Sequence, residues 1–240
     1  MVRGPQAPRD LGRGRRAGPR RRGLTRRAGA TVHGTLLSLN VGVPAPIGQH
    51  RGRPVLSGFR KSPVAGRLRT AGDNLVGDDQ ADRSVHGGPE KAIYAYAGED
   101  LAWWSQGFER PMEPGRAFGE NLTTSGIDCT GAVIGERWRV GSALLEVCQP
   151  RLPCFKLGLV HDDPRMLRHF AGASRPGAYL RIVEHGEIGA GDAIEVHDRP
   201  DHGVTVSLVA DALLLDRSLL PRVLEAPQLA GTLRAQLTGR

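Results

Sequence analysis

A single thiol lies between two cations in the stretch QPRLPCFKL, residues 149–157. Cys154 directly follows Pro153, and Arg151 and Lys156 flank it in the chain. Neighbouring cations stabilise a thiolate and lower the pKa of the thiol, and the thiolate is the form that attacks electrophiles or binds a soft metal. The stretch therefore predicts a nucleophilic or metal-binding Cys154, with a purely structural cysteine as the alternative.

The stretch GDDQADRSVHGGPEKAIYAY, residues 77–96, combines a glycine pair with polar side chains. Gly87 and Gly88 allow the main chain to approach a ligand closely. Positive charge or hydrogen-bond donors would come from Arg83, His86 and Lys91. An ordinary glycine-rich loop is the alternative when this stretch is taken alone.

The stretch AFGENLTTSG, residues 117–126, places short polar side chains beside a glycine. Asn121 and Thr123 are suited to hydrogen-bonding a phosphate or the edge of a heterocycle. The alternative is that Asn121 only holds a turn and that Glu120 points into water.

The remaining cysteines have structural interpretations. Cys148 lies on the apolar alternation of ALLEVC and is expected in the core, and no role is expected for Cys129 in the turn GIDCTG. Three cysteines without a C-x-x-C pair argue against a disulfide framework and a four-thiolate zinc site, and favour a reducing cytoplasm. The acidic start of HDDPRMLRHFAG is explained by a helix that Asp163 caps and Gly172 ends, so a metal is not needed there.

The composition is that of a globular protein. The chain has 240 residues, of which 39% are hydrophobic and 24% charged, enough for one substantial domain and a small appendage. Its 33 glycines and 17 prolines favour short strands joined by turns. No uninterrupted apolar stretch long enough for a membrane span is present, and no secretory or twin-arginine export signal is complete.

The net charge of +8 resides in one segment. Residues 1–30 hold ten arginines and one aspartate, whereas the rest of the chain has 23 basic and 24 acidic residues. We expect residues 1–30 to form a disordered Arg-rich tail. Such a tail attracts nucleic acid non-specifically if it binds anything, and no membrane partner is expected.

The pattern from residue 31 to residue 200 predicts a β-barrel. Residues 31–42 and 92–96 read as strands, residues 98–106 as a short helix, and residues 130–150 as consecutive antiparallel strands around Gly135 and Gly141. Many short strands at close spacing favour a closed barrel.

The pattern turns helical after Gly203. The stretches VTVSLVADALLL, RSLLPRVLEA and PQLAGTLRAQL predict three short helices in residues 203–240, and Leu229, Leu233 and Leu237 would share one face of the last. Helices of this size are unstable alone, so we expect them to pack against one another and against the barrel.

Taken together in this order, the three polar stretches closely resemble the MOSC family, named for the C-terminal domain of molybdenum-cofactor sulfurase. The resemblance is strongest to its YiiM-like branch and covers about residues 32–240. It implies a mainly β fold with α elements: a MOSC β-barrel over residues 31–200, followed by a small three-helix C-terminal domain over residues 203–240.

The resemblance also implies a molybdenum–pterin cofactor with Cys154 as its protein ligand. The segment that matches the family's H-G-G-x-x-K-A pattern lies near the pterin, as does G-E-N-L-T with Asn121 and Thr123. The cofactor-binding residues that we expect are Arg83, Gly87, Gly88, Lys91, Asn121, Thr123, Arg151 and Lys156. Lys61, in RKSPV, falls in a further matching stretch.

The YiiM-like branch is associated with the reduction of N-hydroxylated compounds, such as 6-hydroxylaminopurine, to amines. The resemblance therefore implies a molybdenum-dependent oxidoreductase in which Cys154 and His86 are catalytic, His86 as a proton donor. No flavin, haem or iron–sulfur motif is recognisable, so electrons would come from a separate reductase. The alternatives are a sulfur or cofactor carrier with a persulfide on Cys154 and pyridoxal phosphate bound through Lys91.

Overall fold

The computed structural model describes residues 33–82 and 87–239. The predicted Arg-rich tail, residues 1–30, lies outside this range. Within it seven strands form the main sheet of the molecule: β1 (His33–Val41), β7 (Ile93–Ala97), β8 (Leu122–Ser125), β9 (Arg137–Val140), β10 (Ala143–Pro150), β11 (Ala178–Glu184) and β13 (Ala193–Asp198).

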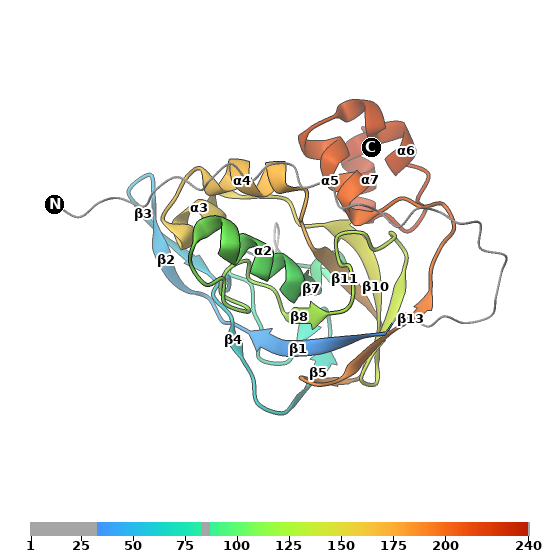
Figure 1. Cartoon of the computed structure of the whole chain (residues 1–240), viewed down its shortest axis with the longest axis horizontal. Coiled ribbons are helices and arrows are strands. Elements are labelled where there is room, and N and C mark those ends of the chain that lie inside the picture. The colour runs from blue at the N-terminus through green and yellow to red at the C-terminus, as the bar shows by residue number, and fades with distance from the viewer. Residues whose placement is uncertain (1–32, 83–86, 240) are drawn as a thin grey trace.

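The seven strands close into a barrel because β1 pairs on both of its edges. It pairs with β8 on one side and with β13 on the other, and the ring runs β1, β13, β9, β10, β11, β7, β8 (Figure 1). Closure leaves no free edge in this ring. The pair β7–β8 is parallel and the other pairs of the ring are antiparallel, and helix α2 (Gly98–Phe108) lies in the connection that a parallel pair requires.

Smaller strands extend the barrel. Strands β2 (Ala45–His50) and β3 (Arg53–Ser57) form a hairpin, and β4 (Ser62–Pro63) pairs with the end of β1. A three-stranded sheet consists of β5 (Arg67–Ala71), β6 (Asn74–Leu75) and β12 (Glu187–Gly189).

The other helices are short and lie mostly in the second half of the chain. They are η1 (Pro89–Lys91), α3 (Phe155–His161), α4 (Met166–Ala173), α5 (Val206–Leu214), η2 (Arg217–Leu219), α6 (Leu220–Val223) and α7 (Gly231–Thr238). Among the described residues, no helix is long and apolar enough to cross a bilayer.

Strand β7 separates two hydrophobic clusters. All five of its residues are buried, and successive side chains of a strand point to opposite faces. Ile93 and Ala95 pack in the larger cluster inside the barrel, whereas Tyr94 and Tyr96 join an aromatic cluster under α2 and α4 that includes Trp104. The burial of both faces fixes the register of β7, and with it the position of Tyr94.

The C-terminal helices pack on the barrel and share its larger hydrophobic cluster. Val209 of α5, Val223 of α6 and Leu233 of α7 are buried in that cluster. The N-terminus of α7 is also fixed by Glu90 of η1, whose carboxylate accepts hydrogen bonds from the Thr232 amide and hydroxyl. Figure 1 shows these helices together at one end of the molecule. A boundary that makes residues 203–240 a separate domain stays a prediction.

The strand and helix predictions agree with the structure in type more than in boundaries. The first strand, the antiparallel pair β9–β10 and helix α2 are confirmed. Helix α4 begins at Met166, and the Asp163 carboxylate accepts a hydrogen bond from the Arg165 amide just before it, in line with the predicted cap. The predicted end is wrong, because Gly172 lies inside the helix and Ser174 ends it in a left-handed conformation. Helix α3 was not predicted, and α7 begins after Leu229.

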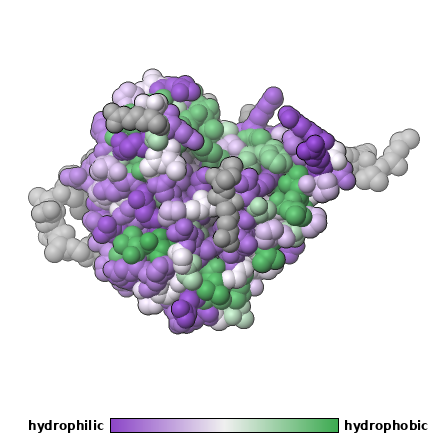
Figure 2. Space-filling view, turned by 180° about the vertical axis from the view of Figure 1, so that it is seen from behind, coloured by the Kyte–Doolittle hydropathy of each residue, from purple (hydrophilic) through white to green (hydrophobic). Residues whose placement is uncertain are grey.

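The surface is largely hydrophilic on the face shown in Figure 2, with separate hydrophobic patches between the polar residues. This agrees with the balanced charge of the chain after residue 30, 23 basic against 24 acidic residues. Scattered apolar patches of this kind are normal on a folded protein.

Truncation of one leucine tests the barrel core. Leu145 on β10 is fully buried in the larger cluster, whereas Leu37 on β1 is 54% exposed. We expect Leu145→Ala to lower the free energy of unfolding by about 2–5 kcal/mol, because a cavity is left in a packed core. Leu37→Ala is the control and should change it by less than about 0.5 kcal/mol. Equal effects in chemical denaturation would contradict the described orientation of these strands.

Candidate functional site

One pocket is lined by side chains from segments that are far apart in the chain. The space between its walls is about 560 Å³, counting the part open to solvent. Its lining consists of Ser57, Gly58, Phe59, Lys61, Gln80, Ala81, Lys91, Tyr94, Phe118, Gly119, Asn121, Arg151, Cys154, Lys156 and Tyr179.

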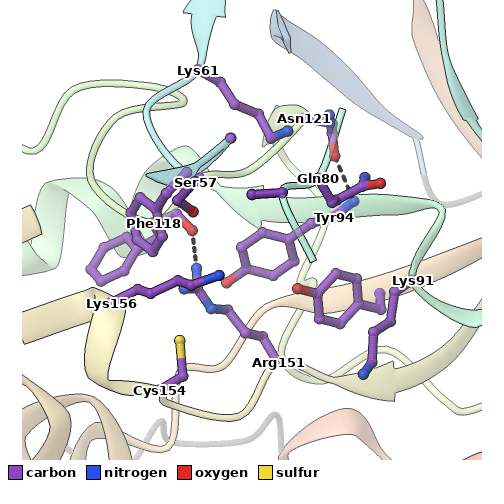
Figure 3. Close-up of a pocket in the computed structure, with 15 residues that line it drawn as sticks. Ser57, Lys61, Gln80, Lys91, Tyr94, Phe118, Asn121, Arg151, Cys154 and Lys156 are labelled. Atoms are coloured by element: carbon purple, nitrogen blue, oxygen red, sulfur yellow. Dashed lines mark hydrogen bonds between the residues drawn. The ribbon is translucent and has the colours of Figure 1, made fainter. Parts of the chain in front are cut away.

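Cys154 is the partly exposed thiol of this pocket. It lies at the end of the loop that follows β10 and immediately precedes α3. In the view of Figure 3, its sulfur points toward the side chains of Arg151 and Lys156. Arg151 interacts electrostatically with Cys154, and Lys156 lines the same pocket, while the role of both cations stays a prediction.

Arg151 is a buried cation held by rings and a carbonyl. Its guanidinium is 4.7 Å from the ring centre of Phe59 and 5.3 Å from that of Tyr94, and Nη1 donates a hydrogen bond to the carbonyl oxygen of Phe118. Burial opposes its charge, but nearby Tyr94, Tyr179 and Cys154 favour it, so the pKa of Arg151 stays above its ordinary value. Arg151 is thus a fixed positive charge beside the thiol.

Lys61 is a second buried cation, and Asp78 compensates its charge. The Lys61 ammonium makes an ion pair with Oδ1 of Asp78, and both side chains are almost fully buried. Burial lowers the pKa of Lys61, while Asp78 and Glu120 act in the opposite direction. Lys61 lines the pocket, and its role in binding stays a prediction.

Asn121 is oriented by hydrogen bonds on both ends of its amide. Its Oδ1 accepts from the Tyr94 amide at 3.1 Å, and its Nδ2 donates to Oδ2 of Asp78 at 3.0 Å and to the Asn40 carbonyl at 3.2 Å. Asn121 lines the pocket, so the prediction that it lies at the site agrees with the structure. Most of its hydrogen-bonding capacity is nevertheless used within the protein.

Lys156 and Lys91 complete the positive charge of the pocket. Lys156 is 8% exposed, and the described residues give it no ion-pair partner. Lys91 ends η1 and lines the wall away from Cys154 in Figure 3. Two lysines that approach from different elements suit a ligand with a negatively charged group.

Other predicted site residues lie behind the wall or outside the described part of the chain. Thr123 is buried, and its hydroxyl donates to Oε1 of Glu120 at 3.0 Å. Gly88 has a φ of 88°, which favours glycine, and its carbonyl accepts from the Lys91 amide, so it shapes the loop before Lys91. Gly87 precedes it in the same loop. Arg83 and His86 are not among the described residues, and their roles stay predictions.

The alternative that Glu120 points into water is wrong. Its side chain is fully buried, and Oε1 accepts hydrogen bonds from the Gly115 amide and from Thr123. Oε2 has no hydrogen-bond partner among the described residues, and burial raises the pKa of this carboxyl group. A buried carboxyl group thus lies directly behind the wall that carries Asn121.

The aromatic wall and Asp78 were not found from the sequence. Tyr94 and Tyr179 lie with ring centres 5.0 Å apart in the pocket lining, together with Phe118. Tyr94 read only as part of a strand, and Tyr179 comes from a strand in a distant segment. Asp78 is in the predicted glycine-rich stretch, where its acidic neighbours Asp79 and Asp82 gave no reason to single it out.

The other two thiols are inert core groups. Cys148 and Cys129 are fully buried, as predicted for Cys148. Burial raises the pKa of Cys148 to about 12, and it raises the pKa of Cys129 still further. Of the three thiols, Cys154 alone is accessible to a ligand or reagent.

The fold and the site define a class of protein: a closed barrel with a cationic, thiol-bearing pocket at the loops between its strands. The MOSC domain family model matches residues 82–195. The uncharacterised protein YflK of Bacillus subtilis is 34% identical over 172 residues, which cover 72% of this chain and 77% of YflK. The chain belongs to the MOSC domain family.

Two further proteins are similar to this chain. The crystal structure of YiiM from Geobacillus stearothermophilus aligns with a TM-score of 0.70 and 26% identity, covering 86% of this chain and 98% of that one. A protein of Gibberella moniliformis named "Reductase" is 34% identical over 154 residues, or 62% of this chain. The match spans only 27% of that protein. The YiiM-like fold and the mainly β architecture predicted from the sequence are therefore confirmed.

Alkylation of the native protein tests the environment of the thiols. We expect iodoacetamide at pH 8 to modify Cys154 at least about tenfold faster than Cys148 or Cys129, because those two are buried and protonated. Peptide mass spectrometry measures the three rates, and the same experiment in denaturant is the control, where the rates should converge. Equally fast labelling of Cys148 in the native protein would contradict this description.

Proposed function

We propose that the pocket binds a molybdenum–pterin cofactor and that the protein is an oxidoreductase that reduces N-hydroxylated compounds to amines. The observation that carries the proposal is the convergence of Cys154, Arg151, Lys156, Lys61, Lys91 and Asn121 on one pocket. Substrates of this class include 6-hydroxylaminopurine and related base analogues.

The available ligands fit a metal that is held mainly by a cofactor. No group of three His, Cys, Asp or Glu side chains in the described ranges could hold a metal ion. The family resemblance makes Cys154 the protein ligand, and a thiolate is the ligand type that a soft metal site selects. Arg151 and Lys156 would favour the ionised form of that sulfur.

The rest of the wall fits a phosphate-bearing heterocycle. The ammonium groups of Lys61, Lys91 and Lys156 supply charge-assisted donors for phosphate oxygens. The rings of Tyr94 and Tyr179 offer flat apolar surface for a heterocycle. Burial raises the pKa of both tyrosines, so their hydroxyl groups remain protonated at neutral pH.

The chain's own contribution to the reaction is binding and electrostatics, whereas a bound molybdenum–pterin cofactor supplies two-electron redox chemistry. Arg151 and Lys156 hold positive charge next to the Cys154 sulfur. The aromatic side chains limit the access of water to the inner wall. Proton delivery by His86 and electron supply by a separate reductase are parts of the proposal that rest on the family resemblance.

The relatives support the redox part of the proposal. The Gibberella moniliformis protein carries the name of a reductase, although the match spans about a quarter of its length. Nine of the fifteen lining residues, from Lys91 to Tyr179, lie in the region that the MOSC family model covers, and the other six, from Ser57 to Ala81, precede it. The names of these relatives give no substrate or electron donor, so both remain parts of our proposal.

Removal of the thiol tests the proposed ligand. Protein made in a cofactor-producing host should lose bound molybdenum in Cys154→Ala, together with more than about 99% of N-hydroxyl reduction, because the protein ligand is gone. Elemental analysis and assays on N-hydroxylated bases and amidoximes measure both. Circular dichroism should show an intact barrel, since Cys154 is not a core residue.

Cys148→Ala is the matched control. It should keep the metal and the activity while losing about 1–2 kcal/mol of unfolding free energy, because it leaves a modest core cavity. Full activity of Cys154→Ala would refute the ligand assignment. Protein with little molybdenum but labile sulfane sulfur on Cys154 would instead support the persulfide carrier.

A further inference from the structure

Asp78 is a buried carboxylate at the meeting point of three segments around the pocket. Its side chain is inaccessible to solvent, although it belongs to an exposed, turn-rich stretch. Oδ1 pairs with the Lys61 ammonium and accepts from the Gly42 amide at 2.8 Å, and Oδ2 accepts from Nδ2 of Asn121 at 3.0 Å. One carboxylate thus fixes two of the residues that line the wall.

We infer that Asp78 is a positioning residue that holds Lys61 and Asn121 in their binding positions and keeps Lys61 charged for an anionic ligand. This inference rests on the proposed function, because it assumes that the pocket takes a ligand with a phosphate group. Asp78 itself does not line the pocket.

The Lys61 side of the contact shows why the carboxylate is needed. The Lys61 backbone amide donates to the carbonyl oxygens of Phe59 and Gly115, so its loop is fixed against the loop before Phe118. Its side chain is 7% exposed, and a buried ammonium without a partner loses its proton or moves to water. Asp78 removes both possibilities and leaves the ammonium at the pocket wall.

The Asn121 side of the contact fixes the direction of an amide. The Tyr94 amide binds Oδ1, so Nδ2 must face the opposite way, toward Asp78 and the Asn40 carbonyl. The same asparagine bonds through its backbone to both neighbours: its amide donates to Tyr94, and its carbonyl accepts from the Asn40 amide. Asn121, directly before β8, therefore links Asp78 to Tyr94 of β7 and to Asn40 of β1.

The inference predicts whether phosphate binding becomes weaker or tighter when the Asp78 carboxylate is removed. A carboxylate near an anion pocket could simply repel the ligand, in which case its removal would tighten binding. A positioning role predicts the reverse, because Lys61 then loses its counter-ion and its place. Glu120 also affects Lys61 electrostatically, but it makes no hydrogen bond or ion pair with Lys61 among the described residues. Its Oε1 accepts from the Gly115 amide and the Thr123 hydroxyl instead.

The experiment compares Asp78→Asn with Asp73→Asn, the same chemical change at an exposed position in the turn between β5 and β6. Calorimetry measures binding of inorganic phosphate to the cofactor-free full-length protein at pH 7.5. Peptide mass spectrometry measures the acylation rate of Lys61 by acetic anhydride. We expect about tenfold weaker phosphate binding and several-fold faster acylation in Asp78→Asn, with no change in Asp73→Asn.

A double variant separates positioning from loss of the fold. Lys61→Met/Asp78→Asn replaces both members of the buried pair, which is far less damaging than stranding one buried charge. If Asp78 acts through Lys61, the Asp78→Asn change should alter phosphate affinity less than about twofold in the Lys61→Met background. Folding of this variant, followed by circular dichroism, keeps the test valid where Asp78→Asn alone is unstable.

The outcomes are distinct. Tighter phosphate binding or an unchanged Lys61 acylation rate in Asp78→Asn overturns the positioning role. An undiminished effect of Asp78→Asn in the Lys61→Met background overturns the part of the inference in which Asp78 acts through Lys61. If the wild-type pocket binds no phosphate, the proposed cofactor site fails, while the acylation rates still decide whether Asp78 holds Lys61.

Discussion

The site depends on keeping positive charge buried beside the aromatic cluster on the outer face of β7. A buried cation is stable only when fixed groups replace the water that it loses. The protein does this in two ways: Arg151 lies among aromatic rings and a carbonyl oxygen, and Lys61 pairs with a carboxylate. These arrangements need walls that do not move, and the closed ring of strands with both faces of β7 buried provides them. The pocket can therefore keep its positive charge only because the barrel is rigid.

The two hydrophobic clusters explain why the pocket lies where it does. The larger cluster fills the barrel and continues under the C-terminal helices, and the aromatic cluster packs beneath α2 and α4. Tyr94 belongs to the second cluster and also lines the pocket, so one wall of the pocket is the edge of a core. The Cys154 thiol in the neighbouring loop is therefore accessible, while Arg151 and Lys61 are shielded from water.

Local sequence patterns predicted several strands and helices and the candidate site residues, but they did not predict which of these residues are buried against one another. Alternation and glycine spacing identified β1, α2 and the β9–β10 pair, and the run around Cys154 was informative because its charges are close in the chain. Lys61, Asp78 and Asn121 meet only through pairing of distant segments, which no local pattern records. The end of α4 was misjudged because Gly172 is compatible with a helix whose face is fixed by Met166 and Phe170 in the aromatic cluster. Glu120 is fully buried with only Oε1 hydrogen-bonded, to the Gly115 amide and the Thr123 hydroxyl, and its charged residue type did not indicate this burial.

The closure of the ring by β1 has a consequence for how the chain reaches this state. His33 of β1 pairs with Glu195 of β13. The first described strand therefore gains its second partner only when the last described strand is in place. Contacts between such distant segments form slowly, because the entropy of a long loop is lost before the pairing rewards it. During synthesis on the ribosome, the thiol loop emerges well before β13, and for that interval the ring of strands is still open between β1 and β9. Assembly of a working pocket is therefore a late event in folding.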